Sequence, residues 1–152
     1  MPVQPIPEGY HSVTPYLIIR GGSDAIDFYT RAFGAHEIMR MPLPDGRLGH
    51  AEIKIGDSIV MLADEAPERN IVSPQSLGGV GVHFLIYVED VDAQFAKALA
   101  FGAKELRPIV NQFYGDRSGT LEDPYGHQWT IATHVEDVSA EEMDRRMKSG
   151  PG

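Results

Sequence analysis

The sequence predicts an α+β protein made of two tandem βαβββ modules and a short C-terminal helix. Three observations predict this fold. The tripeptide Phe-Gly-Ala occurs at 33–35 and again at 101–103, an offset of 68 residues. Each copy follows a stretch with helical spacing of apolar residues, and each of those stretches follows an apolar strand pattern. Segments with the lengths and turns of three further strands come after each copy, so the repeat covers a whole supersecondary unit.

The first strand and the helix of each module can be placed on the sequence. Asp24 and Asp92 lie near the two predicted helix starts, where the positive end of the helix dipole stabilises a carboxylate. The expected strands are 13–19 and 80–88, and the expected helices are 23–32 and 91–100.

The rest of each module aligns with an offset of 70. Glu52 then matches Glu122, and Gly49 matches Gly119. A tight turn is expected before the last strand of each module, at 55–58 and 123–126, and the sequence Asp-Pro-Tyr-Gly of the second favours a type I turn. Three strands at hairpin spacing after each helix argue against the alternating strands and helices of a parallel sheet.

The whole chain is expected to form one domain. A stretch rich in Pro, Gly and Ser separates the modules and predicts an exposed linker. Ser139, followed three residues later by Glu142, predicts a capped helix over 139–148. The expected boundaries within 1–152 are module one at about 12–66, a linker at about 67–79, module two at about 80–135 and a tail at 136–152.

Composition excludes several classes of function. The chain has no cysteine, which removes disulfides, thiolate metal sites and cysteine nucleophiles. Its formal net charge of −9 argues against nucleic-acid binding, which requires clustered Lys and Arg. No basic, apolar leader and no run of about 18 apolar residues is present, so a cytoplasmic protein without a membrane span is expected.

Three local motifs resemble the vicinal oxygen chelate superfamily of glyoxalases, bleomycin-resistance proteins and extradiol dioxygenases. The segment 23–29 with the first Phe-Gly-Ala resembles the "A-x-x-F-Y … G" opening of that superfamily. The segment 88–93 with Gly102 and Ala103 resembles its second-half opening, and 123–127 resembles its "D-P-x-G" hairpin. The resemblance implies curved mixed sheets around a cavity, helices on the outside, a small-molecule ligand and a homodimer.

The resemblance also implies four metal-ligand positions, on the first and last strands of each module. One falls on His83, and the offset of 68 gives Pro15 as its counterpart. The last-strand positions fall on Val60 and Thr130. Because only His83 is a good ligand, we expect the standard metal site to be absent.

A non-standard metal set is an alternative. Strand alternation places His83 and Tyr87 on the cavity side of their strand, and His50 and Glu52 on one face of another, with Glu122 as the counterpart of Glu52. The set His50, Glu52, His83 and Glu122 is competent for Zn, Ni, Mn or Fe. The competing interpretation is that His50 and Glu52 lie on a solvent face and that His83 is a hydrogen-bonded core histidine.

The segment 111–117 is a candidate ligand-binding loop. Tyr114 is expected to stack on or hydrogen-bond a ligand, and Arg117 to clamp an anion. The alternative is a loop closed by an Asp116–Arg117 interaction. His127 is expected to be solvated in its turn, and Trp129 to lie in the core.

Three functions are compatible with these patterns. The first is a metal-independent, drug-sequestering protein that binds a cationic or planar amphiphile through His50, Glu52, His83, Tyr87, Tyr114, Arg117, Glu122 and Thr130. The second is a lyase, isomerase or dioxygenase with the non-standard metal around His83. The third is a structural or regulatory dimer with a vestigial cavity. The sequence leaves open whether the protein is an enzyme.

Overall fold

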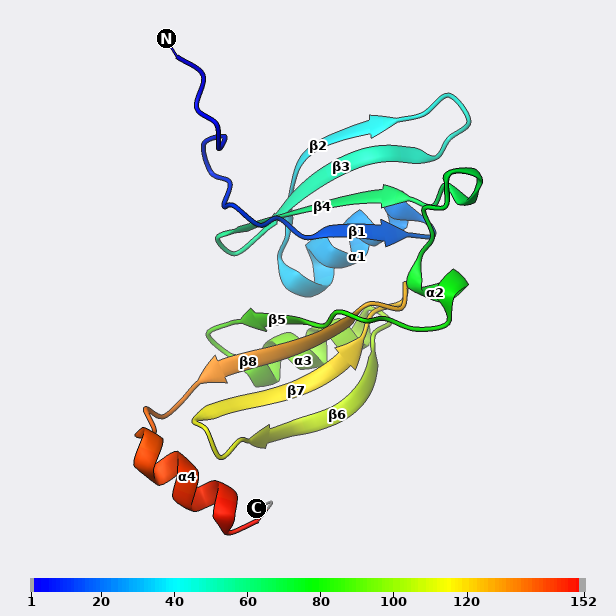
Figure 1. Cartoon of the computed structure of the whole chain (residues 1–152). Coiled ribbons are helices and arrows are strands. Elements are labelled where there is room, and N and C mark those ends of the chain that lie inside the picture. Colours follow the sequence, from blue (N-terminus) through cyan, green and yellow to red (C-terminus); the bar gives the residue numbers. More distant parts are fainter. Residues whose placement is uncertain (1, 151–152) are drawn as a thin grey trace. The chain divides into compact units, whose positions relative to one another are not determined.

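The computed structural model describes residues 2–150, which form two compact units, 2–80 and 81–150. Each unit contains one four-stranded mixed sheet and one long helix against it (Figure 1). The predicted α+β fold of two tandem βαβββ modules with a C-terminal helix is therefore confirmed. Among the described helices, none is long and apolar enough to cross a membrane.

The first unit has the strand order β1-β4-β3-β2. Strand β1 runs parallel to β4, and the other neighbours are antiparallel. The elements are β1 (Tyr16–Ile19), α1 (Gly22–Phe33), β2 (His36–Pro42), β3 (Leu48–Ile55) and β4 (Ser58–Asp64), followed by the short helices η1 (Pro67–Arg69) and α2 (Pro74–Leu77).

Helix α1 covers one face of the first sheet because its apolar residues recur at helical spacing. The aromatic rings of Tyr29 and Phe33 stack with centroids 5.7 Å apart, and Tyr29 is fully buried. From the sheet, alternate residues such as Leu17, Ile19 and Leu62 are buried on this same face. The opposite face of the sheet carries no helix of this unit (Figure 1).

The second unit repeats the arrangement with the strand order β5-β8-β7-β6. Its elements are β5 (Phe84–Tyr87), α3 (Val91–Ala100), β6 (Lys104–Asn111), β7 (Asp116–Glu122) and β8 (Gln128–His134). Asp90 caps α3 by accepting a hydrogen bond from the Ala93 amide at 3.1 Å. Trp129 is buried against Phe84, as expected for a core residue.

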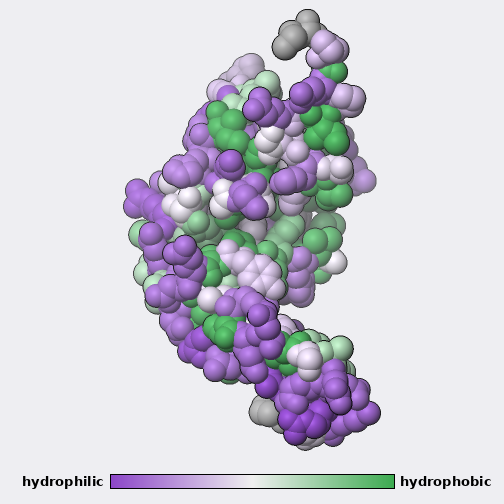
Figure 2. All heavy atoms as spheres, turned by 90° about the vertical axis from the view of Figure 1, so that its left-hand side faces the viewer, coloured by the Kyte–Doolittle hydropathy of each residue, from purple (hydrophilic) through white to green (hydrophobic). Residues whose placement is uncertain are grey.

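Helix α4 (Ala140–Lys148) begins at Ser139, whose hydroxyl accepts a hydrogen bond from the Glu142 amide at 3.1 Å. The predicted cap is therefore confirmed. None of its residues is buried, and its surface is strongly hydrophilic (Figure 2). Arg146 attaches the helix to its unit by donating to the Phe113 carbonyl and pairing with Glu136.

The structure corrects the sequence expectations in two places. Strands β1 and β5 are four residues long, shorter than expected. The linker is exposed over most of its length as expected, but Ser73 within it is fully buried. Its amide and hydroxyl both donate to the Glu65 carboxylate, which joins the segment to the end of β4.

Candidate functional site

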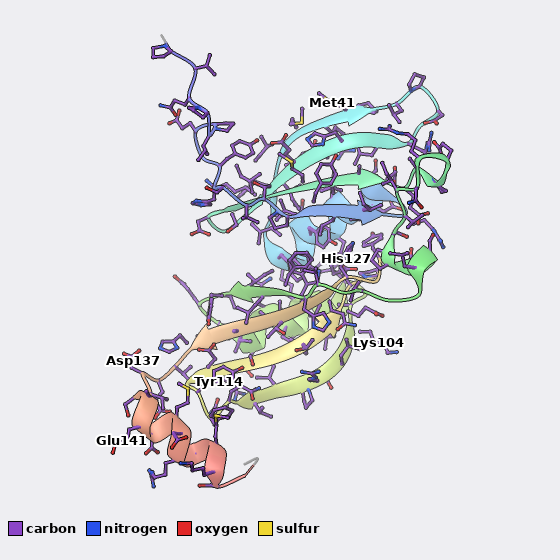
Figure 3. All side chains as sticks on the ribbon, viewed as in Figure 1. Met41, Lys104, Tyr114, His127, Asp137 and Glu141 are labelled. Atoms are coloured by element: carbon purple, nitrogen blue, oxygen red, sulfur yellow. The ribbon has the colours of Figure 1, made fainter. Side chains whose placement is uncertain are left out.

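A row of side chains crosses the helix-free face of the first sheet. The strand register pairs Met39 with Glu52, Glu52 with Met61 and Met61 with Tyr16. Directly paired residues point to the same face of a sheet, so these four side chains lie side by side. In the next row Met41 pairs with His50 (Figure 3 shows Met41 on β2). The face therefore combines thioethers, an aromatic ring, an imidazole and one carboxylate.

Four polar side chains on this face form a continuous hydrogen-bonded chain. The Tyr10 hydroxyl donates to Glu52 Oε1. His50 Nε2 lies 2.9 Å from Glu52 Oε2, and His50 Nδ1 lies 2.7 Å from the Tyr16 hydroxyl. With neutral His50, Nε2 must carry the proton to face a carboxylate, and Nδ1 then accepts from Tyr16. The carboxylate thus fixes one tautomer of the imidazole.

The hydrogen-bonded chain is buried at Glu52 and exposed at its Tyr16 end. Glu52 is 9% exposed, whereas Tyr16 is 47% exposed. Burial raises the pKa of the Tyr16 phenol, so that group stays protonated near neutral pH. Among residues 2–150, no Lys or Arg forms an ion pair with Glu52; its ionic partner is His50. Its negative charge is therefore balanced by hydrogen bonds alone when His50 is neutral.

A pocket of about 210 Å³ adjoins this face, and Tyr16 forms part of its wall. The ends of β1, β3 and β4 contribute Ile18, Leu48 and Ala63, and the segment after β4 closes it with Glu65 and other residues. Hydrogen bonds from Ser73 and then Ser76, with a smaller contribution from Arg20, lower the pKa of Glu65 to about 2. The pocket therefore has an apolar floor and a rim that carries both signs of charge, with Glu65 and Glu68 beside Arg47 and Arg69.

The helix-free face of the second sheet carries a different set of polar groups. The hydroxyls of Thr120 and Thr130 lie 2.9 Å apart. Tyr87 donates to Asp116 at 2.8 Å, and the other oxygen of Asp116 lies 2.8 Å from His134 Nδ1. The Asp116 carboxylate raises the pKa of the Tyr87 phenol and, together with Asp137, of His134.

The predicted site residues of the second unit are only partly brought together. Tyr87, Glu122 and Thr130 share the helix-free face by register. His83 is exposed and lies one residue before β5. Tyr114 lies in the turn between β6 and β7 (Figure 3), where its ring packs edge-on against Phe113.

Arg117 is held away from that face by α3. Its guanidinium forms two hydrogen bonds to the Asp92 carboxylate, at 2.8 and 2.9 Å, and a third to Asn111. The alternative of a loop closed by an Asp116–Arg117 interaction is wrong, because successive residues of β7 point to opposite faces and Asp116 binds Tyr87 and His134 instead.

His127 is buried rather than solvated, with 8% exposure and its ring near Phe84. Asp123 causes this conformation of the turn. One of its oxygens accepts from the His127 and Tyr125 amides, and the other accepts from the Trp129 indole at 2.8 Å. The first residue of the Asp-Pro-Tyr-Gly motif is therefore a structural anchor.

Comparison with known proteins decides the family. The model of the Glyoxalase/Bleomycin resistance protein/Dioxygenase superfamily matches residues 13–131. The chain belongs to this superfamily. An uncharacterised Mycobacterium bovis protein is 40% identical over 141 residues, which are 91% of this chain and 93% of that protein.

Solved structures of the superfamily share the fold. A gene product of Arabidopsis thaliana matches with a TM-score of 0.66 and 25% identity, covering 81% of this chain and 98% of that one. The fosfomycin resistance protein FosX of Listeria monocytogenes matches with a TM-score of 0.62 and 15% identity, covering 88% of this chain and 97% of that one. The latter similarity is one of fold alone.

The structure revises which residues occupy the superfamily's metal positions in the first unit. Glu52 pairs with Met61 and Glu122 with Gln128, so the last strands align with an offset of 67. The counterpart of Thr130 is therefore Ala63. Val60, assigned by the offset of 70, is buried on the α1 face instead.

The same register makes Tyr16, not Pro15, the counterpart of His83. The four superfamily positions thus hold a phenol, a methyl group, an imidazole and a hydroxyl, which is a poor donor set for a divalent metal. In the non-standard set, both ring nitrogens of His50 already have hydrogen-bond partners. In neither unit do the described residues bring three His, Asp or Glu side chains together as a metal site. The residues present do not fit a metal.

Sequence reasoning missed Tyr10, Tyr16, Asp116 and His134. Tyr10 lies in an irregular segment 42 residues before its partner Glu52, and no pattern in the sequence connects them. The other three carry a detectable signal. Alternation within the strands puts Tyr16 on the same face as Glu52, two strands away, and puts Asp116 and His134 on the face of Thr130.

Proposed function

We propose that the protein binds a planar, cationic amphiphile on the helix-free face of the first sheet, without a metal. The observation that carries this proposal is the row Met39, Glu52, Met61 and Tyr16. It places one carboxylate between two thioethers, and the second thioether lies beside an aromatic ring. Such a surface attracts a cation through the carboxylate and the ring face, and thioethers adapt to varied planar shapes.

The charge on Glu52 supports a cationic ligand in particular. A carboxylate with 9% exposure and no Lys or Arg partner gains from a counter-charge brought by a ligand. The net charge of −9 further favours the approach of a cation. The pocket beside Tyr16 has a volume of about 210 Å³, below the roughly 300 Å³ of a whole drug-sized site, so it suits one substituent of the ligand.

Calorimetric titration with a cationic acridine dye and with a neutral analogue of the same ring system tests the proposal. We expect micromolar binding of the cation and a Kd at least tenfold weaker for Glu52→Gln, a change of about 1.4 kcal/mol. Glu141→Gln is the matched control. Glu141 is exposed on α4, and its substitution by Gln removes the same charge as Glu52→Gln does. The binding proposal would be contradicted if wild type and Glu52→Gln bound the cation with equal affinity. It would also be contradicted if wild type bound the neutral analogue as tightly as the cation.

A homodimer and a cytoplasmic location belong to the same proposal. The superfamily resemblance supports the first, and the composition supports the second. Sedimentation velocity of the full chain tests the dimer.

A further inference from the structure

The order of groups in the hydrogen-bonded chain is unusual for a purely structural network. A buried carboxylate, Glu52, holds an imidazole, His50, which in turn accepts from a half-exposed hydroxyl, that of Tyr16. Carboxylate, imidazole and hydroxyl in this order form the arrangement by which a positioned histidine takes a proton from a hydroxyl. A structural role would not require the hydroxyl at the accessible end.

We propose that Tyr16, His50 and Glu52 form a metal-independent proton relay that acts as a general base on a molecule bound over the first sheet. The inference rests on the proposed function only for the location of the binding face. It does not depend on a positive charge on the ligand.

The relay moves one proton in two coupled transfers. The bound molecule loses a proton from carbon to the Tyr16 oxygen, while the proton of that hydroxyl passes to His50 Nδ1 over the 2.7 Å hydrogen bond. One C–H bond breaks and one N–H bond forms, and the electron pair stays on the bound molecule. The resulting imidazolium is stabilised by the Glu52 carboxylate, 2.9 Å from Nε2. The proton later returns to the product or to water.

The surroundings of His50 favour this role. Burial raises the pKa of the Tyr16 phenol, so this group is protonated before the reaction and gives its proton to His50 only as it takes up the carbon proton. The groups around the imidazole are Tyr16 on β1, Met41 on β2 and Glu52 on β3, with Tyr10 reaching Glu52 from the N-terminal segment. Lys54 lies on the same face of β3, beyond Glu52, and Arg47 and Arg69 line the pocket beside Tyr16. A carboxylate is thus the direct charged partner of the imidazole.

The substrate class follows from the chemistry of the base. An imidazole-strength base removes protons from activated carbon acids, whose electrons move onto an electron-withdrawing or leaving group. The thioethers and the ring of Tyr16 favour a planar molecule. We infer an elimination or isomerisation of a planar carbon acid.

The elimination of 5-nitrobenzisoxazole is a direct test, because it needs only a positioned base. The base removes the ring C–H proton, the electron pair completes a nitrile, and the N–O bond breaks to release a coloured phenolate. We expect the full-length protein to raise the rate of elimination above the rate in buffer alone. We expect kcat to fall about 100-fold in Tyr16→Phe and in His50→Gln, with KM nearly unchanged. Added imidazole should restore part of the rate in His50→Ala, a response that a structural role would not give.

The controls separate this inference from the binding proposal. Glu141→Gln and Tyr125→Phe, on α4 and in the β7–β8 turn, should keep the wild-type rate. Far-UV circular dichroism checks that each variant is folded. Acridine binding by wild type without any elimination rate, or a full rate in Tyr16→Phe, would overturn the relay and leave the binding proposal standing. Elimination without acridine binding would overturn the binding proposal alone.

Discussion

The Asp64 carboxylate accepts a hydrogen bond of 2.6 Å from the Gly22 amide at the start of α1. The same oxygen accepts from Gly21, and the other accepts from Leu48 at 2.6 Å. One side chain at the end of β4 therefore joins the helix N-terminus to two strands. A carboxylate suits this place because the first amides of a helix lack partners and carry partial positive charge.

Asp64→Asn should lower the free energy of unfolding by about 1–3 kcal/mol, because an amide nitrogen replaces one accepting oxygen and leaves a donor unsatisfied. Urea unfolding followed by far-UV circular dichroism measures the change. Asp57→Asn, in the exposed β3–β4 turn, is the control and should stay within about 0.5 kcal/mol of wild type. Equal loss in both variants would show that Asp64 is not an anchor.

The elements that local chemistry determines were predictable. The two long helices follow from apolar spacing, and the α4 cap follows from Ser139. The proximity of His50 and Glu52 could be predicted because residues two apart on a strand share a face.

The residue correspondence between the last strands of the two modules could not be predicted from the sequence. The β3–β4 hairpin closes with Ile55 opposite Ser58, whereas Glu122 opposes Gln128 across a longer turn. Glu52 precedes its partner Met61 by nine residues, whereas Glu122 precedes Gln128 by only six, so the offset falls from 70 to 67 across the hairpin and the superfamily position moves from Val60 to Ala63. Turn length decides register, and the matched glycines alone do not reveal it.

His134 should stabilise the second unit in a pH-dependent way. Asp116, and then Asp137, raise the pKa of His134 in the folded state. A raised pKa gives stability that is fully present below the unfolded value of about 6.5 and is lost as pH rises through the folded pKa. The Tm of wild type should therefore exceed that of His134→Gln most clearly near pH 5.5, with the difference shrinking toward pH 9.

The exposed His11 provides the control for this measurement, since His11→Gln should leave the difference in Tm flat across the same pH range. A difference between wild type and His134→Gln that grows with rising pH has the opposite sign and would rule out the Asp116–His134–Asp137 linkage. Figure 3 shows Asp137 just before α4, three residues after its partner His134.

Glu65 should stabilise the first unit with the opposite sign. Hydrogen bonds from Ser73 and Ser76 lower its folded pKa to about 2 from an ordinary value of 4.5. The contribution is therefore present above about pH 4.5 and is lost as pH falls toward 2. Glu65→Gln should have a free energy of unfolding about 1–2 kcal/mol below that of wild type at pH 7, measured with urea, and the two values should converge near pH 2.

Glu8→Gln, in the exposed N-terminal segment, is the control and should match wild type throughout. A gap that persists at pH 2 would mean that shape, not charge, matters at this position.

Gly119 allows a packing prediction in the second unit. A Cβ atom at this residue would lie 2.9 Å from Ile109 Cγ1 and 2.9 Å from Phe95 Cε2, on β6 and α3. The close approach of helix and strand therefore requires a glycine, and Gly119→Ala should cost about 1–3 kcal/mol of stability through overpacking. Gly79→Ala is the matched control, because nothing lies within 4 Å of its added Cβ. That change should be neutral or slightly stabilising, since it restricts the unfolded chain. Chemical unfolding of both variants measures the contrast, and equal stability would show that α3 moves away from β7 at little cost.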